Sequence, residues 1–290
     1  MWQRARRALR RWTERAIANL TRLVPPRVDG LLTRNGYALL TDLEDAAYTE
    51  AVSALERFQV EFLAATRSVW RADFPIPPDA LGHFSRQWEY PYAWANAGPA
   101  RGRLLDAGSG LTFLPFLFAA AGFDVVCCDA DCENLGYADR VDEASSLTRL
   151  RVGFEQCLLE ELPFPEGAFQ AVVCVSAIEH VRSAPDVVLE SLAQVTAPGG
   201  RLVLTCDVDL RGTGDIRLDC LGVILKAFEH HFEPAFPIDL RRPPTLLTSD
   251  HFEGAEQWRL PAVWRWREGP QAEPLRSLAV LGLTGVRRPT

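Results

Sequence analysis

Long hydrophobic runs are missing from this 290-residue chain, and lysine occurs only once, at Lys226. No stretch reaches the roughly 18 uncharged apolar residues that a membrane-spanning helix needs. Arginines also interrupt every apolar stretch between Trp2 and Leu23, which does not fit a secretory signal peptide. We therefore expect a cytoplasmic protein without a transmembrane segment.

Paired cysteines are missing as well. The chain has seven cysteines but no Cys-x-x-Cys motif, and no histidine cluster accompanies Cys128 and Cys132, the nearest approach to one. Four cysteines lie inside apolar runs, where a free cysteine behaves as a small hydrophobic side chain: Cys127, Cys128, Cys174 and Cys206. This pattern predicts reduced core thiols in a cytosolic protein, and no metal site.

The formal net charge of −7 is distributed unevenly. Residues 1–27 contain eight arginines and the single acid Glu14, a balance of +7 that leaves −14 for the rest of the chain. Such an acidic body argues against a nucleic-acid substrate. The apolar residues of 1–27 recur at three- and four-residue steps, which predicts a basic amphipathic helix. It has three interpretations: packing on the domain, peripheral contact with an anionic membrane, or binding of a partner.

From residue 102 onward, short apolar segments alternate with helical ones. Such alternation is typical of a parallel, doubly wound α/β sheet. The predicted strands are 103–107, 123–128, 149–155, 169–175, 200–206 and 277–287, and the predicted helices are 112–121, about 132–141, 184–195 and 215–230.

The turn LLDAGSG, residues 104–110, joins the first of these strands to a helix. Doubly wound sheets bind ligands beside this turn, at the carboxyl ends of their strands. A dinucleotide site needs a third glycine where this chain has Phe113, and a Walker loop needs a longer glycine spacing and a lysine. A nucleoside without phosphates fits better, because it needs close backbone approach but no deep anion site.

Two acids support this interpretation. Asp106, at the lip of the turn, repels phosphate and can accept hydrogen bonds from an ammonium group. Asp129 ends the second strand about twenty residues on, where a carboxylate can pair with ribose hydroxyls. The alternatives are that Asp106 only braces the turn and that Asp129 only caps the next helix. The spacing of the two acids favours ligand binding.

Three motifs together resemble the class I S-adenosylmethionine-dependent methyltransferases, in particular their small-molecule, type 11-like branch. They are LLDAGSG, LPFPEGAFQAVVCVSAIEHV at 162–181 and TAPGGRLVLT at 196–205. The resemblance implies a Rossmann-like, doubly wound α/β fold with a seven-stranded, mostly parallel sheet, its last hairpin reversed, and an N-terminal helical extension. It also implies S-adenosylmethionine as the methyl donor.

The resemblance assigns the donor-site residues as well. It implies that Asp106, Gly108 and Gly110 line the methionine side of the donor. Asp129 then holds the ribose, and Ala130 lies near the adenine.

The chain departs from the family pattern near the adenine. Leu158 stands where the family often has an aspartate beside the adenine amine. Glu155 and Glu160 are the nearby acids that can substitute for it.

Methyl transfer from a sulfonium is an in-line displacement, in which the protein mainly aligns the partners and sometimes removes a proton. We expect His180 or Asp207 to be the catalytic residue, as a general base or substrate clamp. The alternatives are that His180 packs or caps the following helix and that Asp207 is a solvated loop acid. The wider candidate set follows the fourth and fifth strands: Ser176, Glu179, His180, Asp207 and Asp209.

The segment 28–100 is expected to form a helical cap or lid beside the domain 101–290. A helix is predicted from Thr41, whose hydroxyl would form a capping box with Glu44, to about Trp70. A second, aromatic segment at 83–96 is predicted to lead into a short helix. It forms either a lid over donor and acceptor or an aromatic seal at the sheet edge.

Some acceptors are disfavoured. SAIEH follows the fourth strand in place of the Asn/Asp-Pro-Pro-aromatic tetrad of enzymes that methylate amide or base nitrogens, and there is no Pro-Cys nucleophile. We therefore expect methylation of an oxygen or nitrogen in a small-molecule, lipid- or glycan-linked acceptor. The alternative is a catalytically inactive binding or scaffold protein with a methyltransferase fold. The oligomeric state stays open.

Overall fold

The computed structural model describes residues 20–28, 30–70, 81, 84–99, 102–132, 134–211, 218–252 and 277–289. Most of the predicted basic helix at 1–27 therefore lies outside the described residues. Of its carboxyl end, Leu20 is buried in the main hydrophobic core. In the described ranges, no helix combines the length and apolar character needed to cross a membrane.

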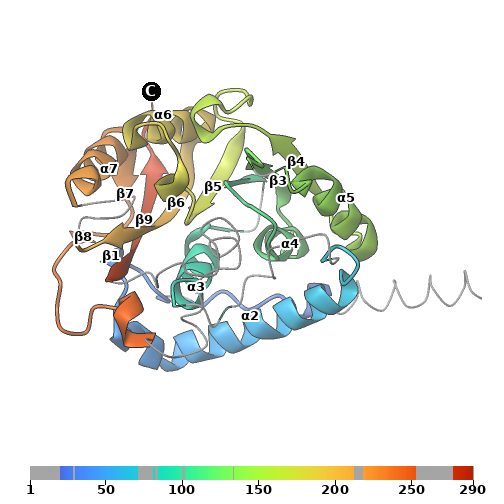
Figure 1. The fold of residues 1–290 in the computed structure, drawn as a ribbon, viewed down its shortest axis with the longest axis horizontal. Helices are drawn as coiled ribbons and strands as arrows, with labels where there is room; N and C mark the ends of the chain where they lie inside the picture. The colour runs from blue at the N-terminus through green and yellow to red at the C-terminus, as the bar shows by residue number, and fades with distance from the viewer. Residues whose placement is uncertain are drawn as a thin grey trace, which may run out of the picture.

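The centre of the molecule is a nine-stranded mixed sheet in the order β4-β3-β2-β5-β6-β9-β1-β8, with β7 also pairing with β9 (Figure 1). The first five strands in this order are parallel. They lie close to their predicted positions, which confirms the doubly wound α/β fold. Their bounds are β2 (Arg103–Ala107), β3 (Asp124–Asp129), β4 (Val152–Gln156), β5 (Phe169–Val175) and β6 (Thr196–Asp209).

The remaining strands form the other edge of the sheet. The predicted final strand, β9 (Leu278–Arg287), runs antiparallel to β6, as expected for a reversed last hairpin. In the described residues, three short strands that were not among the six predicted ranges extend this edge, so the sheet has nine strands where the resemblance implies seven. They are β1 (Asn35–Tyr37), β7 (Phe232–Pro234) and β8 (Ile238–Asp239).

Strand β1 comes from the segment that the sequence analysis treats as helical. A strand of three residues is too short to show periodicity, and distant partners hold it in place. The Asn35 side-chain amide donates to the carbonyls of Phe236 (2.9 Å) and Thr284 (3.0 Å) and accepts the N–H of Thr284 (2.6 Å). The segment 28–100 therefore contributes to the sheet as well as to its helical cover.

Helices cover both faces of the sheet (Figure 1). Side chains alternate between the faces, so that Leu104 of β2 belongs to one core cluster and Leu105 to the other. Asp106 therefore lies on the same face as Leu104. That face is covered by α2 (Ala46–Ala65), α3 (Arg86–Asn96), α4 (Leu114–Ala120) and α5 (Tyr137–Thr148), and the opposite face by α6 (Pro185–Val195) and α7 (Leu218–His231).

The predicted capping box at Thr41 is wrong. Thr41 lies in the short 3-10 helix η1 (Leu40–Glu44), and α2 begins after it. Asp45 caps α2 instead, because its carboxylate accepts two first-turn N–H groups at 2.8 and 3.1 Å. A threonine hydroxyl and a nearby aspartate carboxylate compete for this role, and the aspartate lies at the start of the regular helix.

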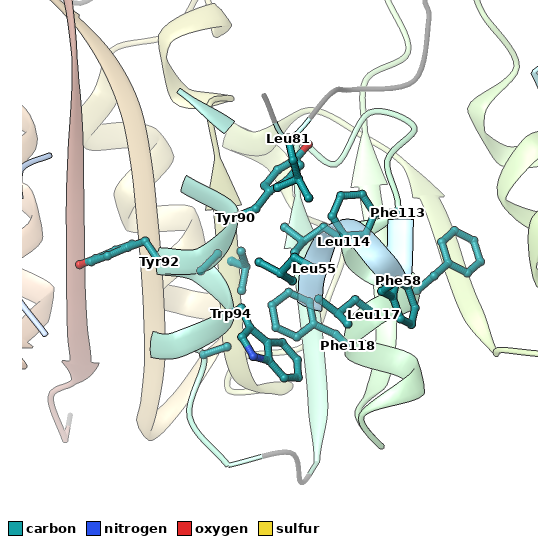
Figure 2. Close-up of a cluster of buried hydrophobic side chains, with 14 of the residues drawn as sticks. Leu55, Phe58, Leu81, Tyr90, Tyr92, Trp94, Phe113, Leu114, Leu117 and Phe118 are labelled. Carbon is teal, nitrogen blue, oxygen red and sulfur yellow. The ribbon is translucent and has the colours of Figure 1, made fainter. Parts of the chain in front are cut away.

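Helix α3 packs between α4 and β9, with aromatic side chains on both sides. Tyr90 and Trp94 point toward the side chains of α2 and α4, whereas Tyr92 points away toward the sheet (Figure 2). The Tyr92 hydroxyl donates to the Arg34 carbonyl at 2.9 Å and accepts a hydrogen bond from the Thr284 hydroxyl at 2.9 Å. Burial raises the pKa of Tyr92 well above its usual range. The aromatic residues of α3 therefore anchor this helix in the core.

Candidate functional site

The turn after β2 lies directly against β3 and the segment after β5. The N–H groups of Gly108 and Ser109 both donate to the Cys128 carbonyl, at 2.8 and 3.0 Å. Gly108 has φ +73°, and a Cβ added there would lie 2.3 Å from the Cβ of Ala177. Glycine is required here by both the backbone conformation and the close approach of Ala177.

Gly110, two residues on, has open space beside it. Its φ is +52°, and a Cβ added to it would have no heavy atom within 4 Å. Its N–H donates to an Asp129 carboxylate oxygen at 2.9 Å. The turn therefore exposes backbone to an approaching ligand while the end of β3 holds it in place. This arrangement fits the predicted nucleoside donor.

Asp106 is only 2% exposed at the end of β2. Burial, and to a lesser extent the neighbouring charge of Asp129, raise the pKa of Asp106 to about 7. Without a ligand, this carboxyl is therefore partly protonated at neutral pH. A positively charged ligand group beside it would favour the ionised form.

Asp129 is half-buried at the end of β3. Its two carboxylate oxygens accept the N–H groups of Gly110 and Asp131, each at 2.9 Å. Burial raises the pKa of Asp129, and these two hydrogen bonds partly oppose that rise. A carboxylate oxygen has two acceptor positions, so both oxygens can still accept a hydroxyl. Ala130 follows, with its carbonyl accepting the Gln156 side-chain amide at 3.2 Å.

Asp131 orders the loop after β3, and the sequence analysis missed it. It is 6% exposed, and its carboxylate accepts the N–H groups of Leu135 (2.7 Å), Gly136 (2.9 Å) and Tyr137 (3.2 Å). The helix predicted from residue 132 therefore begins later, at Tyr137. The glycine at position 136 was the signal in the sequence for this later start, because glycine is unfavourable in a helix interior. In the structure it has φ +73° and precedes the helix.

Leu158 follows β4, at the start of the 3-10 helix η2 (Leu159–Glu161). Its side chain is 45% exposed, which is high for a leucine. The Glu160 carboxylate accepts the Ser183 hydroxyl at 2.7 Å, which ties it to the loop before α6. Glu155 lies exposed on β4. The adenine contacts of Ala130 and of these acids stay predictions.

A second group of polar residues lies where β5 and β6 end, on the face covered by α3. Glu89 of α3 is fully buried, and one of its carboxylate oxygens accepts the hydroxyls of Ser176 (2.7 Å) and Thr205 (2.8 Å). Its other oxygen forms a salt bridge with Arg86. Glu89 thus ties the covering helix to both strands.

Glu179 and Asp207 complete this group. Glu179 lies on the 3-10 helix η3 (Ile178–His180) and accepts the backbone N–H of Asp207 at 3.1 Å. The Glu179 Oε2 and Asp207 Oδ1 atoms are buried without a hydrogen-bond partner. Burial raises the pKa of both carboxyls, and the negative charge of Glu89 raises it further. His180 opposes this rise for both groups, and Arg86 opposes it for Asp207. We call Glu89, Glu179 and Asp207 the carboxyl cluster.

The other predicted catalytic residues lie around this cluster. His180 is exposed on η3, so its role as a base stays a prediction. Ser176 has φ +44° and donates its hydroxyl to Glu89. Asp209 is buried and accepts the N–H of Arg211 at 2.7 Å, which stabilises the turn after β6. The sequence analysis placed Glu89 only in a possible lid, because its contact with β5 and β6 depends on tertiary structure.

A parallel doubly wound sheet with this glycine turn and two acids at adjacent strand ends defines a nucleoside-binding α/β domain. Residues 105–204 match the family described as a methyltransferase domain. The chain thus carries a class I S-adenosylmethionine-dependent methyltransferase domain, which confirms the prediction from the motifs.

The chain is similar to several known proteins. A ubiquinone biosynthesis O-methyltransferase of Xanthomonas axonopodis pv. citri is 30% identical over 146 residues, which are 50% of this chain and 58% of that protein. An uncharacterised Synechococcus protein is 27% identical over 201 residues, 64% of this chain and 43% of that protein. The chain therefore spans about half the length of these curated relatives.

The chain is also similar to a solved structure. It is the geranyl diphosphate C-methyltransferase of Streptomyces coelicolor A3(2), in complex with Mg²⁺, geranyl diphosphate and S-adenosylhomocysteine. The TM-score is 0.49 at 17% identity, over 94% of this chain and 98% of that chain.

Proposed function

We propose that this chain is an active methyltransferase that uses S-adenosylmethionine to methylate an oxygen or nitrogen of a small-molecule, lipid- or glycan-linked acceptor. One observation carries the proposal: the open backbone at Gly110 is held by the half-buried Asp129, whose charge also acts on the buried Asp106. The donor supplies an electrophilic methyl group when bound. Asp129 has acceptor positions left, which we assign to the ribose hydroxyls, and we assign Asp106 to the donor's ammonium group.

We assign Asp207 as the general base that accepts a proton from the acceptor. It is half-buried near the end of β6 and has one buried oxygen without a hydrogen-bond partner. Because its pKa is raised, its ionised form is a stronger base than an ordinary aspartate. His180 is the second candidate, and its exposed side chain lies beside Glu179.

Formation of S-adenosylhomocysteine from S-adenosylmethionine, with a panel of amine, phenol and alcohol acceptors, tests this proposal. We expect turnover with at least one acceptor class. We also expect Asp129→Ala to weaken donor binding at least about tenfold, since hydrogen bonds to a charged group are lost. Asp142→Ala, an exposed acid of α5, is the control. Donor binding without turnover on any acceptor would favour the inactive scaffold.

The role of Glu89 in methyl transfer is testable separately. Glu89→Gln keeps an acceptor for Ser176 and Thr205 but removes the charge that pairs with Arg86. We expect turnover to fall by about ten- to a hundredfold through misplacement of the strand ends, with donor affinity unchanged. Glu56→Gln, an exposed acid of α2, is the control. Unchanged turnover in a folded Glu89→Gln protein would contradict a role of α3 in methyl transfer.

A further inference from the structure

The carboxyl cluster holds more acidic groups than the basic side chains that the described residues place beside it. Glu89 and Arg86 face it from α3, Glu179 and His180 from η3, and Asp207 from β6. Arg86 forms its salt bridge with Glu89, and Glu179 and Asp207 are joined to each other by the hydrogen bond from the Asp207 N–H. The thiols of Cys174 and Cys206 are buried on the opposite face of the sheet, and the charge of Glu179 helps to raise the pKa of both. Among the described residues, three acids therefore face one arginine and one exposed histidine.

Two oxygen atoms of the cluster have no hydrogen-bond donor within the part of the chain that the structure describes. Glu179 is 7% exposed, and its Oε2 has no partner, although its other oxygen holds the Asp207 backbone. Asp207 Oδ1 is also without a partner. A buried carboxylate without donors is unfavourable, and proteins almost always satisfy such atoms with a protein group, a water or a ligand.

The cluster also lies next to the donor turn. Ala177, two residues before Glu179, is the residue that a side chain at Gly108 would meet. The carboxyl end of β5 is thus shared between the glycine turn on one side and the cluster on the other. Asp207 is half-buried, so the cluster keeps an accessible side.

We infer that the acceptor carries a protonated amine, and that Glu179 and Asp207 bind this ammonium group beside the methyl donor. An ammonium has three N–H donors and a positive charge, so it can satisfy both orphan oxygens and balance the acids. A hydroxyl has a single donor and no charge, and a phosphate or carboxylate would meet like charges. This inference rests on the proposed function, because it takes the cluster as the acceptor side of the site.

Three probes with one apolar body and different head groups test the inference: n-hexylamine, n-hexanol and hexanoate. Each is titrated by NMR into the full chain saturated with S-adenosylhomocysteine, at about pH 8. We expect hexylamine to bind at least about tenfold more tightly than hexanol, as for a charge-assisted hydrogen bond, and hexanoate not to bind. Hexylamine binding should weaken as the pH falls, because the cluster takes up protons.

Asp207→Asn should weaken hexylamine binding at least about tenfold and leave hexanol binding unchanged. Glu179→Gln is the second variant, in case one of them fails to fold. Asp142→Asn makes the same charge change on the outside of α5 and should have no effect.

Several results would overturn the inference. They are hexanol binding as tightly as hexylamine, no probe binding at all, or an amine preference that survives in both variants. A fall in S-adenosylmethionine affinity as large as the fall in hexylamine affinity would assign the cluster to the donor instead. If the wild-type chain binds no S-adenosylmethionine, the proposed function fails, and the same titration without S-adenosylhomocysteine still decides what the cluster binds.

Discussion

Replacing Gly108 with alanine is expected to raise the dissociation constant for S-adenosylmethionine at least about a hundredfold. The added methyl group would lie 2.3 Å from the Cβ of Ala177, at a φ of +73° that alanine rarely adopts. The strained conformation alone costs about 1–2 kcal/mol, and the clash requires the turn to move. Because the N–H groups of Gly108 and Ser109 fix this turn to β3, its movement displaces the backbone that we propose binds the donor. Isothermal titration calorimetry measures the loss.

Two further variants separate the clash from the strain. Gly199→Ala places alanine at a similar φ of +76° near the start of β6, where its Cβ would have no heavy atom within 4 Å. It should lower the melting temperature slightly and leave donor binding intact. Adding Ala177→Gly to Gly108→Ala removes the colliding atom and should recover part of the affinity. Wild-type binding by Gly108→Ala, or no recovery in the double variant, would contradict this explanation.

Donor affinity is also expected to fall steeply below neutral pH. The pKa of Asp106 is raised to about 7. We propose that Asp106 pairs with the donor's ammonium group, and only its ionised form can do so. The dissociation constant should therefore rise about fivefold between about pH 7 and 6, and about tenfold over the next unit. Calorimetry at each pH should show weak binding by Asp106→Asn with a much flatter pH profile. The raised pKa of Asp129 adds a smaller effect in the same direction.

The same carboxyl has an opposite effect on the stability of the ligand-free protein. Its pKa is higher in the folded than in the unfolded state, so the folded state binds more protons between the two values. The free energy of unfolding should therefore decrease as the pH rises from about 4 to about 7, by a few kcal/mol from Asp106. Urea unfolding of Asp106→Asn should lose this decrease, and a profile identical to that of the wild type would contradict the burial of this charge.

The part of the fold that depends on local pattern could be predicted from the sequence. Each parallel strand is a short apolar run that alternates with a helix, and the glycine turn is a local motif, so β2 to β6 were found from the sequence, whereas the assignment of the donor-site residues stays a prediction. Strand β1 was not, because only its pairing with β9 and the contacts of Asn35 with Thr284 make it a strand.

The carboxyl cluster shows a second limit of sequence reasoning. Glu179 and His180 are adjacent, and sequence alone favoured the histidine, the usual proton carrier near neutral pH. In the 3-10 turn, Glu179 is buried and His180 is exposed. Glu89 is distant from both in sequence and reaches Ser176 and Thr205 only because α3 packs against the sheet. Neither the direction of the turn nor the placement of α3 is encoded in a local pattern.

Calorimetric titration of the full chain with S-adenosylmethionine, and separately with NAD⁺, decides whether the glycine turn binds the methyl donor. We expect one S-adenosylmethionine molecule to bind per chain, Gly108→Ala to lose this binding, and NAD⁺ not to bind. The absence of S-adenosylmethionine binding by the folded chain, or tighter binding of NAD⁺, would contradict it.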